Sequence, residues 1–507
     1  MQPLLTVDRA RSVARLSRPI QIRGILYLAT CQEGVNARTI VRQTEATFLV
    51  LGNLTTAAGR DNPPHGDHRG IQGTRDVIRL VHLSDIHFTA SKEGLARRNR
   101  SLRHDLLNDL KKVKSTLGSA QAVLVTGDIA FTGHPDEYAV ARSWLDEVCD
   151  ACGVPKSAVL CVPGNHDVNR GAMGPTDRDI RERLRRCAPG EVDATLEEYL
   201  SEPRLPILLP LNNYNDFAAS YCCQLSDPQA PYWQTDLPLD TDRTLTIRGM
   251  TTVLCSDKDD RRANLVVGRT QATLPLDRPD RIYMILAHHP PDWWHDQDAV
   301  LDVLRHRARL ALFGHKHAQR IEQVDDCLRV VAGAVHPEEG GSWEPRYNWL
   351  ELGVREGPPK LTVRLCPRVF RRETNSFVGE KDFYRELDLP GGAAVEDGGD
   401  GDRASALERV ERSEESPPPK AVLRPPMVGP SEDRDVVRAF LELPYPEQMR
   451  ILQALDLLEE DDRDKGFVAL ASAALARARE RGLSGRLAEE VARATTRTPH
   501  PHEEEPQ

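Results

Sequence analysis

Asp85 and His87 are the first residues in this chain whose types and spacing suggest chemistry, at the end of the stretch Val77–Phe88. The first half of this stretch is apolar and β-branched, which predicts a buried strand. Side chains at positions i and i+2 of an extended segment point to the same side, so both residues can reach one metal ion. A carboxylate oxygen with an imidazole nitrogen suits a borderline or hard transition metal. By itself the pair also fits a solvated strand end.

Four further blocks of polar residues follow, each directly after an apolar run, and together they make a metal site the better interpretation. The blocks are Gly127-Asp128, Gly164-Asn165-His166-Asp167, His288-His289 and Gly314-His315-Lys316-His317. Glycine before a ligand lets the backbone turn sharply or approach the site closely. One carboxylate that bridges two cations is needed in a dinuclear site, and Asp128 is the natural candidate.

Strands and helices alternate around these blocks. We predict strands in the first half of 77–88 and at 121–126, 158–162, 281–287, 309–313, 328–332, 348–352 and 360–365, and helices at 99–114, 136–152 and 296–307. Such an order is typical of a layered α/β domain with its site at the carboxyl ends of the strands. The sequence between 168 and 280 interrupts the pattern, and we interpret it as an insertion.

Length and composition exclude several classes of protein. With 507 residues the chain is expected to form two or three domains, and its net charge of -10 argues against a protein that coats nucleic acid or an anionic membrane. It has no apolar run of about 18 residues, as a membrane-spanning helix would need. The ten cysteines form no spaced framework, and the first residues do not resemble a signal peptide, so we expect a cytoplasmic protein.

Composition also predicts the domain boundaries. Residues 1–76 are rich in arginine and poor in apolar runs, which predicts a disordered extension. We assign the α/β domain to 77–388, an acidic Pro/Gly-rich linker to 389–432, a small helical domain to 433–496 and a disordered tail to 497–507. The linker predicts that the two folded parts are only weakly coupled.

The five blocks, in this order, resemble the motifs of the calcineurin-like metallophosphoesterase family over residues 77–370. The resemblance implies a four-layer αββα sandwich with two metal ions at its edge. It assigns the metal ligands residue by residue: Asp85, His87 and His317 for one ion, Asn165, His288 and His315 for the other, and Asp128 between them. His289 competes with His288, which we prefer because the first histidine of the related His-x-Pro turns binds metal. His336 is interpreted as a structural residue.

The same resemblance implies the reaction. Manganese or iron ions, or zinc as an alternative, would supply a metal-bound hydroxide that attacks phosphorus, and His166 would donate a proton to the leaving oxygen. The blocks are most similar to the branch of cyclic-nucleotide phosphodiesterases, so the implied substrate is a phosphodiester or a nucleotide. A metal-dependent nuclease is the alternative, but the segment 168–280 has fewer basic than acidic residues and offers no basic groove.

The carboxyl-terminal helical domain carries no catalytic pattern. Its apolar stripes, with Ile451, Leu452, Leu455 and Leu458 in the first and Leu483, Leu487 and Val491 in the second, predict amphipathic helices. The segment 440–458 is similar to the helical effector-associated adaptor domains of bacterial conflict and signalling systems. That resemblance implies an effector that binds a protein partner. The alternatives are a generic dimerisation module, or an interaction protein that uses the phosphoesterase fold as a scaffold.

Overall fold

The computed structural model describes residues 21–22, 25–26, 77–89, 93–202, 206–225, 227, 230–275, 278–336, 344–355, 357–389, 427–428, 431–459, 462 and 467–497. The chain divides into two compact units, Met1–Arg69 and Gly70–Gln507. In the first unit, β1 (Gln21–Ile22) pairs with β2 (Ile25–Leu26) in an antiparallel hairpin. The predicted extension, linker and tail otherwise lie outside the described residues.

The first large sheet of the second unit carries the strand that begins the metal-site pattern. Its order is β14 (Ser376–Gly379), β13 (Lys360–Arg371), β12 (Arg346–Arg355), β3 (Val77–Leu83), β4 (Ala122–Thr126) and β5 (Val159–Val162), and β15 (Phe383–Asp388) also pairs with β13. Strands β3, β4 and β5 are parallel neighbours, so their carboxyl ends meet at one edge. The helices α2 (Glu93–Leu117) and α3 (Pro135–Cys152) connect them and pack on this sheet through Leu110 and Leu145.

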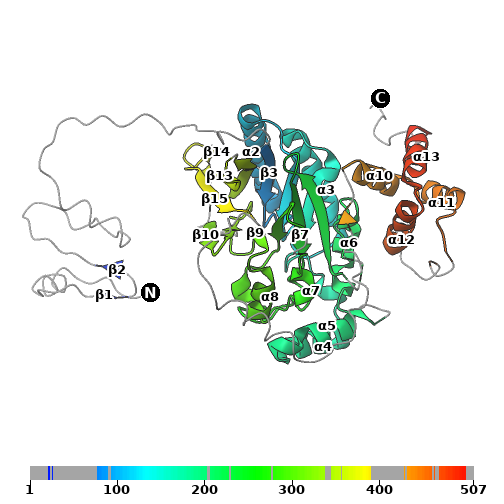
Figure 1. Ribbon diagram of the computed structural model, residues 1–507, viewed down its shortest axis with the longest axis horizontal. Coiled ribbons are helices and arrows are strands. Elements are labelled where there is room, and N and C mark those ends of the chain that lie inside the picture. Colours follow the sequence, from blue (N-terminus) through cyan, green and yellow to red (C-terminus); the bar gives the residue numbers. More distant parts are fainter. Residues whose placement is uncertain are drawn as a thin grey trace, which may run out of the picture. The chain divides into compact units, whose positions relative to one another are not determined.

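The second sheet packs against the first. Its order is β10 (Arg320–Val324), β11 (Cys327–Val331), β9 (Ala308–Phe313), β8 (Arg281–Leu286), β7 (Thr244–Met250), β6 (Tyr232–Pro238) and β16 (Met427–Val428). In β8, Met284 belongs to the core shared by both sheets, whereas Ile285 packs with α7 (Arg269–Ala272) and α8 (Gln297–Leu304) on the outer face. The layers are therefore helix, sheet, sheet and helix (Figure 1), which confirms the predicted αββα sandwich.

The segment 168–280 is more than an insertion, and in this respect the sequence interpretation is wrong. Its second half supplies β6 and β7, and β7 is a parallel neighbour of β8. Only its first half is an addition to the sandwich, with α4 (Pro175–Arg186), α5 (Val192–Leu200) and α6 (Asn212–Ala219). The buried Trp233 ties β6 to the other sheet because its indole N–H donates to the Cys161 carbonyl at 2.8 Å.

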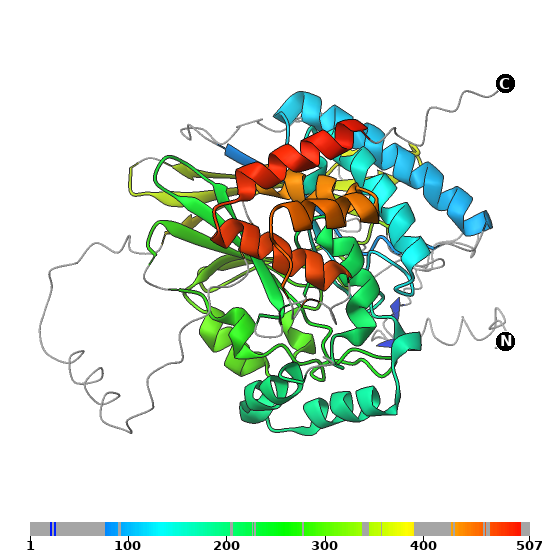
Figure 2. The ribbon, with the colours of Figure 1, turned by 90° about the vertical axis from the view of Figure 1, so that its right-hand side faces the viewer.

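Four helices near the carboxyl end, α10 (Ser431–Glu442), α11 (Tyr445–Ala454), α12 (Phe467–Glu480) and α13 (Ser484–Arg497), share a small core of their own, and Figure 2 shows them in orange and red. This core confirms the predicted helical module. The prediction of weak coupling is wrong, because Arg438 of α10 donates two hydrogen bonds of 2.8 Å to Asp146 of α3.

Within the described ranges, no helix is both long and apolar enough to span a membrane.

Candidate metal centre

The predicted ligands all lie in loops that directly follow strands. Asp85 and His87 follow β3, Asp128 follows β4, Asn165 and His166 follow β5, His288 follows β8, and His315 and His317 follow β9. The two sheets thus bring together residues that lie 230 positions apart in sequence, because His315 N donates to Asp85 Oδ2 at 3.2 Å. The edge where these strands end is the place predicted for the site.

The backbone of this edge is strained, which the sequence argument did not foresee. Five of the predicted ligands have φ between 52° and 68°: Asp85, His87, Asp128, His315 and His317. Such left-handed conformations cost roughly 1–3 kcal/mol at residues other than glycine and persist only where the surroundings enforce them. Asp85 and His87 therefore do not converge as neighbours on an extended strand, as we expected. They converge because the chain turns sharply after Leu83.

Asp128 occupies the middle of the cluster. Its Oδ2 lies 3.3 Å from Nε2 of His87 and 3.3 Å from Nε2 of His288, which belong to the two predicted ligand sets. Its Oδ1 accepts a hydrogen bond from the backbone N–H of His166 at 2.8 Å. The residue is 1% exposed. One carboxylate oxygen thus faces both sets, as a bridging ligand must.

The first set consists of Asp85, His87 and His317, whose ligand atoms lie within 4.8 Å of one another. Oδ1 of Asp85 is fully buried and makes no hydrogen bond, although Nε2 of His317 is 3.3 Å away. A buried carboxylate oxygen without a hydrogen bond is costly unless a cation accompanies it. The donor atoms of this set therefore fit a metal ion.

The second set contains Asn165, His288 and His315. Oδ1 of Asn165 lies 3.2 Å from Nε2 of His288 and 3.1 Å from Nδ1 of His315. The other nitrogen of His288 donates to the Thr126 carbonyl at 2.7 Å, which fixes the ring and leaves Nε2 as the ligand atom. His289 also lies within reach of His288 and His315; Thr252 Oγ1 engages its Nδ1 at 2.9 Å, and its buried Nε2 makes no hydrogen bond among the described residues. The preference for His288 stays a prediction, which its 3.3 Å contact with Asp128 supports.

Among the described ion pairs, the carboxylates of Asp85 and Asp128 pair with histidines alone. Burial raises the pKa of Asp128, but His288 and His87 outweigh it and leave the pKa well below its usual value. Burial lowers the pKa of His288, yet the Asp128 carboxylate raises it to about 9. Burial and His288 together lower the pKa of His315 to about 4, so this imidazole keeps a free lone pair at neutral pH. A proton on His288 therefore competes with a metal ion for the negative charge of the Asp128 carboxylate.

His166 stands beside the first set. Its ring centre is 4.8 Å from that of His87, and its Nδ1 is 2.7 Å from the Phe131 carbonyl oxygen. Because a carbonyl only accepts, Nδ1 carries the hydrogen and Nε2 is the nitrogen left for a substrate. No orienting carboxylate for His166 could be identified from the sequence, and in the structure a backbone carbonyl takes that place.

Sequence reasoning missed several residues that hold the loops of the centre. The buried Asp167 carboxylate accepts from the backbone N–H groups of Ile129 at 3.2 Å, Ala130 at 2.9 Å and Gly164 at 2.8 Å, so it ties the Asp128 loop to the Asn165 loop. The block that contains Asn165 includes Asp167, but the sequence argument gave this acid no role. His336 borders the site through its backbone, since its N–H donates to the Asp85 carbonyl at 3.1 Å, and we keep the structural interpretation.

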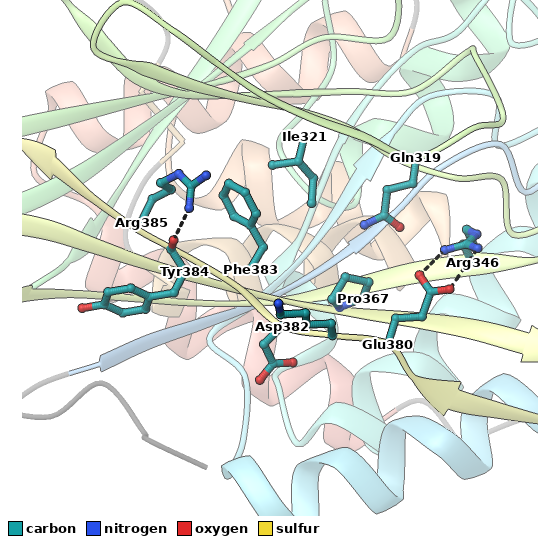
Figure 3. A pocket seen from close by; sticks show the side chains of 10 residues that line it. Gln319, Ile321, Arg346, Pro367, Glu380, Asp382, Phe383, Tyr384 and Arg385 are labelled. Atoms are coloured by element: carbon teal, nitrogen blue, oxygen red, sulfur yellow. Dashed lines mark hydrogen bonds and ion pairs between the residues drawn. The ribbon is translucent and has the colours of Figure 1, made fainter. Parts of the chain in front are cut away.

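A separate pocket of about 650 Å³ lies beside β10 and β15 and contains none of the predicted ligands. Figure 3 shows Gln319, Arg346 and Glu380 along one part of its wall and Phe383 and Arg385 along another. The guanidinium of Arg385 lies 4.1 Å from the centre of the Phe383 ring, and Arg346 pairs with Glu380 at 2.5 Å. These contacts pair four of the wall side chains with one another, and the pocket contains none of the predicted ligands.

Comparison with known protein families identifies two parts of this chain. Residues 78–319 match the family model of the calcineurin-like phosphoesterases, and residues 432–493 match that of the GTPase-associated adaptor domains. Both resemblances drawn from the sequence are thereby confirmed. Among curated proteins, the glycerophosphodiester phosphodiesterase GpdQ of Enterobacter lignolyticus (strain SCF1) is 34% identical over 91 residues, which is 17% of this chain and 29% of that protein. The chain thus matches less than a third of that relative's length.

The solved structures that match this chain are less similar to it in sequence. The purple acid phosphatase PPD1 from seeds of yellow lupin (Lupinus luteus) is 12% identical, with 62% of this chain and 54% of that chain covered and a TM-score of 0.33. Vps29 of Chaetomium thermophilum is 10% identical, with 62% and 100% covered and a TM-score of 0.27.

Proposed function

We propose that this chain, in which residues 78–319 form a calcineurin-like phosphoesterase domain, is a metal-dependent phosphodiesterase for cyclic nucleotides or related small diesters. The observation that supports it most is the position of Asp128, whose Oδ2 is equally distant, at 3.3 Å, from a histidine of each ligand set. The similarity to a glycerophosphodiester phosphodiesterase supports a diester rather than a monoester substrate.

The residues fit two cations. One would be held by Asp85, His87 and His317, the other by Asn165, His288 and His315, with Asp128 shared between them. When bound, two ions of manganese, iron or zinc would neutralise charge on the phosphoryl oxygens and lower the pKa of a water molecule towards roughly 7. Histidine and carboxylate ligands suit all three metals, so the donor set alone does not select one.

The chain itself supplies the proton for the leaving group. His166 is fixed at Nδ1 by the Phe131 carbonyl and at its backbone N–H by Asp128, so the direction of its Nε2 is set before substrate binds. Because Nδ1 already carries a hydrogen, the ring protonated at both nitrogens holds a second proton at Nε2. This proton can pass to the leaving oxygen as the bond to phosphorus breaks, which leaves a neutral imidazole. Such a positioned acid typically accelerates the reaction by about 10²–10⁴.

The adaptor domain gives the enzyme a place in a larger assembly. Residues 432–493 carry no cluster that could hold a metal among those described, and they match an adaptor family, so we assign them to a protein partner. We place the protein in the bacterial cytoplasm, as an effector of a conflict or signalling system. This assignment rests on the sequence and on the adaptor match.

Substrates with different leaving groups test the proposal. The purified protein, supplied with Mn²⁺, should hydrolyse bis-p-nitrophenyl phosphate and cyclic nucleotides. His166→Ala should keep its metals but lose about 10²–10⁴ of its rate on ribose esters, and less on nitrophenyl esters, whose leaving group needs no proton. Rapid cleavage of single-stranded DNA with no activity on small diesters would favour a nuclease instead, and no hydrolysis of any ester would favour a scaffold.

A further inference from the structure

The orientation of His166 depends on one short loop. Among the described residues, its side chain makes one hydrogen bond, from Nδ1 to the Phe131 carbonyl oxygen at 2.7 Å. The Phe131 ring also stacks on the imidazole, with ring centres 5.1 Å apart and planes 28° apart. Both contacts come from the segment 129–134, which joins β4 to α3. Whatever fixes this segment therefore fixes the direction in which Nε2 of His166 points.

The buried carboxylate of Glu137 holds that segment through hydrogen bonds. Glu137, in the first turn of α3, accepts hydrogen bonds from Thr132 N at 2.9 Å, Thr132 Oγ1 at 3.0 Å and His134 N at 3.2 Å. The residue is 4% exposed, and the described ion pairs give it no basic partner. Its charge is therefore balanced by three donors of the loop. Hydrogen bonds to a charged group are shorter and about twice as strong as neutral ones.

The rest of the loop is held on both sides of Phe131. Its backbone N–H donates to the Phe88 carbonyl at 3.0 Å, and Asn213 Nδ2 donates to the Gly133 carbonyl at 2.8 Å. Gly133 has φ of +69°, and a Cβ there would meet the Asp167 carbonyl. Glu137 thus accepts from the backbone N–H of Thr132, and the carbonyl of the same peptide group, that of Phe131, accepts from His166 Nδ1. These two hydrogen bonds connect α3 to the imidazole through one peptide group.

We propose that Glu137 is a positioning residue for His166: it holds the Phe131 carbonyl where it keeps Nε2 directed at the leaving oxygen. The inference rests on the proposed function, in which His166 is the proton donor. A residue that only caps α3 would stabilise the fold without affecting one class of substrate. A residue that positions the acid affects substrates with a poor leaving group more, because these depend on the proton.

The test is a double-mutant cycle on the metal-loaded, full-length protein. Glu137→Ala should slow hydrolysis of a ribose or alkyl diester by roughly 10–100-fold, as small misplacements of a catalytic group do, and a nitrophenyl diester by much less. In the His166→Ala background the same change should have no further effect. Glu137→Gln, which keeps an acceptor of the same size, should restore part of the activity on the alkyl diester.

Asp177 provides a matched control. It is also a buried acid in the first turn of a helix, α4, and accepts from the backbone N–H of Gly174 at 2.6 Å. Asp177→Ala should lower the melting temperature without changing the ratio of the two substrate rates. A readout independent of turnover is the ¹⁵N shift of His166 Nδ1, which should move from that of a hydrogen-bonded N–H towards an average of both tautomers in Glu137→Ala.

The outcomes separate the inference from the proposed function. If Glu137→Ala slows both substrates equally, or still slows them in the His166→Ala background, Glu137 is structural and the inference is wrong. If His166→Ala itself shows no dependence on the leaving group, the acid role of His166 fails and the inference fails with it. Should Glu137→Ala not fold, Thr132→Val removes one of the three donors, and the same two comparisons decide.

Discussion

The two adjacent histidines of the fourth block differ in what surrounds them, although their sequence position makes them nearly equivalent. His288 faces Asp128 and Asn165, whereas the Nδ1 atom of His289 is bonded to Thr252. Burial lowers the pKa of His289, and His315 and His288 lower it further, well below its ordinary value, so this ring stays neutral beside the charged centre. At the scale of single residues, the contact with Asp128 favours His288 as the predicted ligand.

This difference predicts how each histidine affects metal binding. His288→Ala should lose about one metal ion per chain, because it removes a nitrogen that faces Asp128 and Asn165. His289→Ala should keep both ions and lose roughly 2–4 kcal/mol of stability, as expected for truncating a large buried side chain. Metal analysis and urea denaturation of both variants measure this. Loss of metal from His289→Ala with retention in His288→Ala would reverse the assignment.

At the scale of elements, close approach between loops sets the shape of the centre. A Cβ at Gly164 would overlap Oδ1 and the backbone nitrogen of Asp128, and a Cβ at Gly314 would overlap Ser84 Oγ. The loop after β5 can approach the Asp128 loop, and the loop after β9 can approach Ser84, only because these two positions lack a side chain. The strain at the five left-handed ligands is stored in the same loops.

Gly164→Ala should therefore disturb the centre more than it disturbs the fold as a whole. We expect about 1–3 kcal/mol lower stability, since overpacking a tight site costs that much, together with weaker metal binding. Gly190→Ala is the control, because a Cβ there would meet no atom within 4 Å. Calorimetric titration with Mn²⁺ and thermal unfolding compare the two. Equal metal affinity in Gly164→Ala and the unchanged protein would show that the loops tolerate the added carbon.

The strands and the ligand blocks could be predicted from the sequence because both are local patterns of side chains. Asp85, Asp128 and His315 each follow an apolar run that became a strand. The contacts that orient these side chains could not be predicted, because the Thr126 and Phe131 carbonyls that hold His288 and His166 have no signature in sequence. The role of β6 and β7 was hidden for a related reason, since only pairing with β8 distinguishes them from an insertion.

At the scale of the whole second unit, the adaptor helices are joined to the phosphoesterase domain by specific contacts. Arg438 of α10 is 7% exposed and bonds to Asp146, 292 positions away, and to the Lys156 carbonyl at 3.1 Å. Ser157 also donates to Asp435, and Gln224 donates to Ser472 of α12 at 3.1 Å. Composition of the linker cannot reveal such pairs, so the sequence predicted independent parts. Since α3 also carries Glu137, the contact lies on the helix that supports the His166 loop.

Arg438→Ala should therefore destabilise the protein by about 1.5–3 kcal/mol, the range for losing hydrogen bonds to a charged group. Arg493→Ala is the control, because this arginine is exposed and its pairs with Glu489 and Glu490 lie within one helix, where such pairs contribute roughly 0.3–0.5 kcal/mol. Urea denaturation followed by tryptophan fluorescence measures the difference, because all six tryptophans lie between Trp144 and Trp349. Equal effects of the two substitutions would show that the adaptor helices do not rest on α3 in solution.

Seven side chains, Asp128 and the six predicted ligands around it, are proposed to hold two metal ions. The most direct measurement is the metal content of the purified protein and of Asp128→Asn after dialysis against limiting Mn²⁺. We predict two ions per chain in the unchanged protein, and fewer than one in Asp128→Asn, because the amide lacks the charge and the second oxygen that both ligand sets face. Two ions retained by Asp128→Asn, or at most one bound by the unchanged protein, would contradict the account.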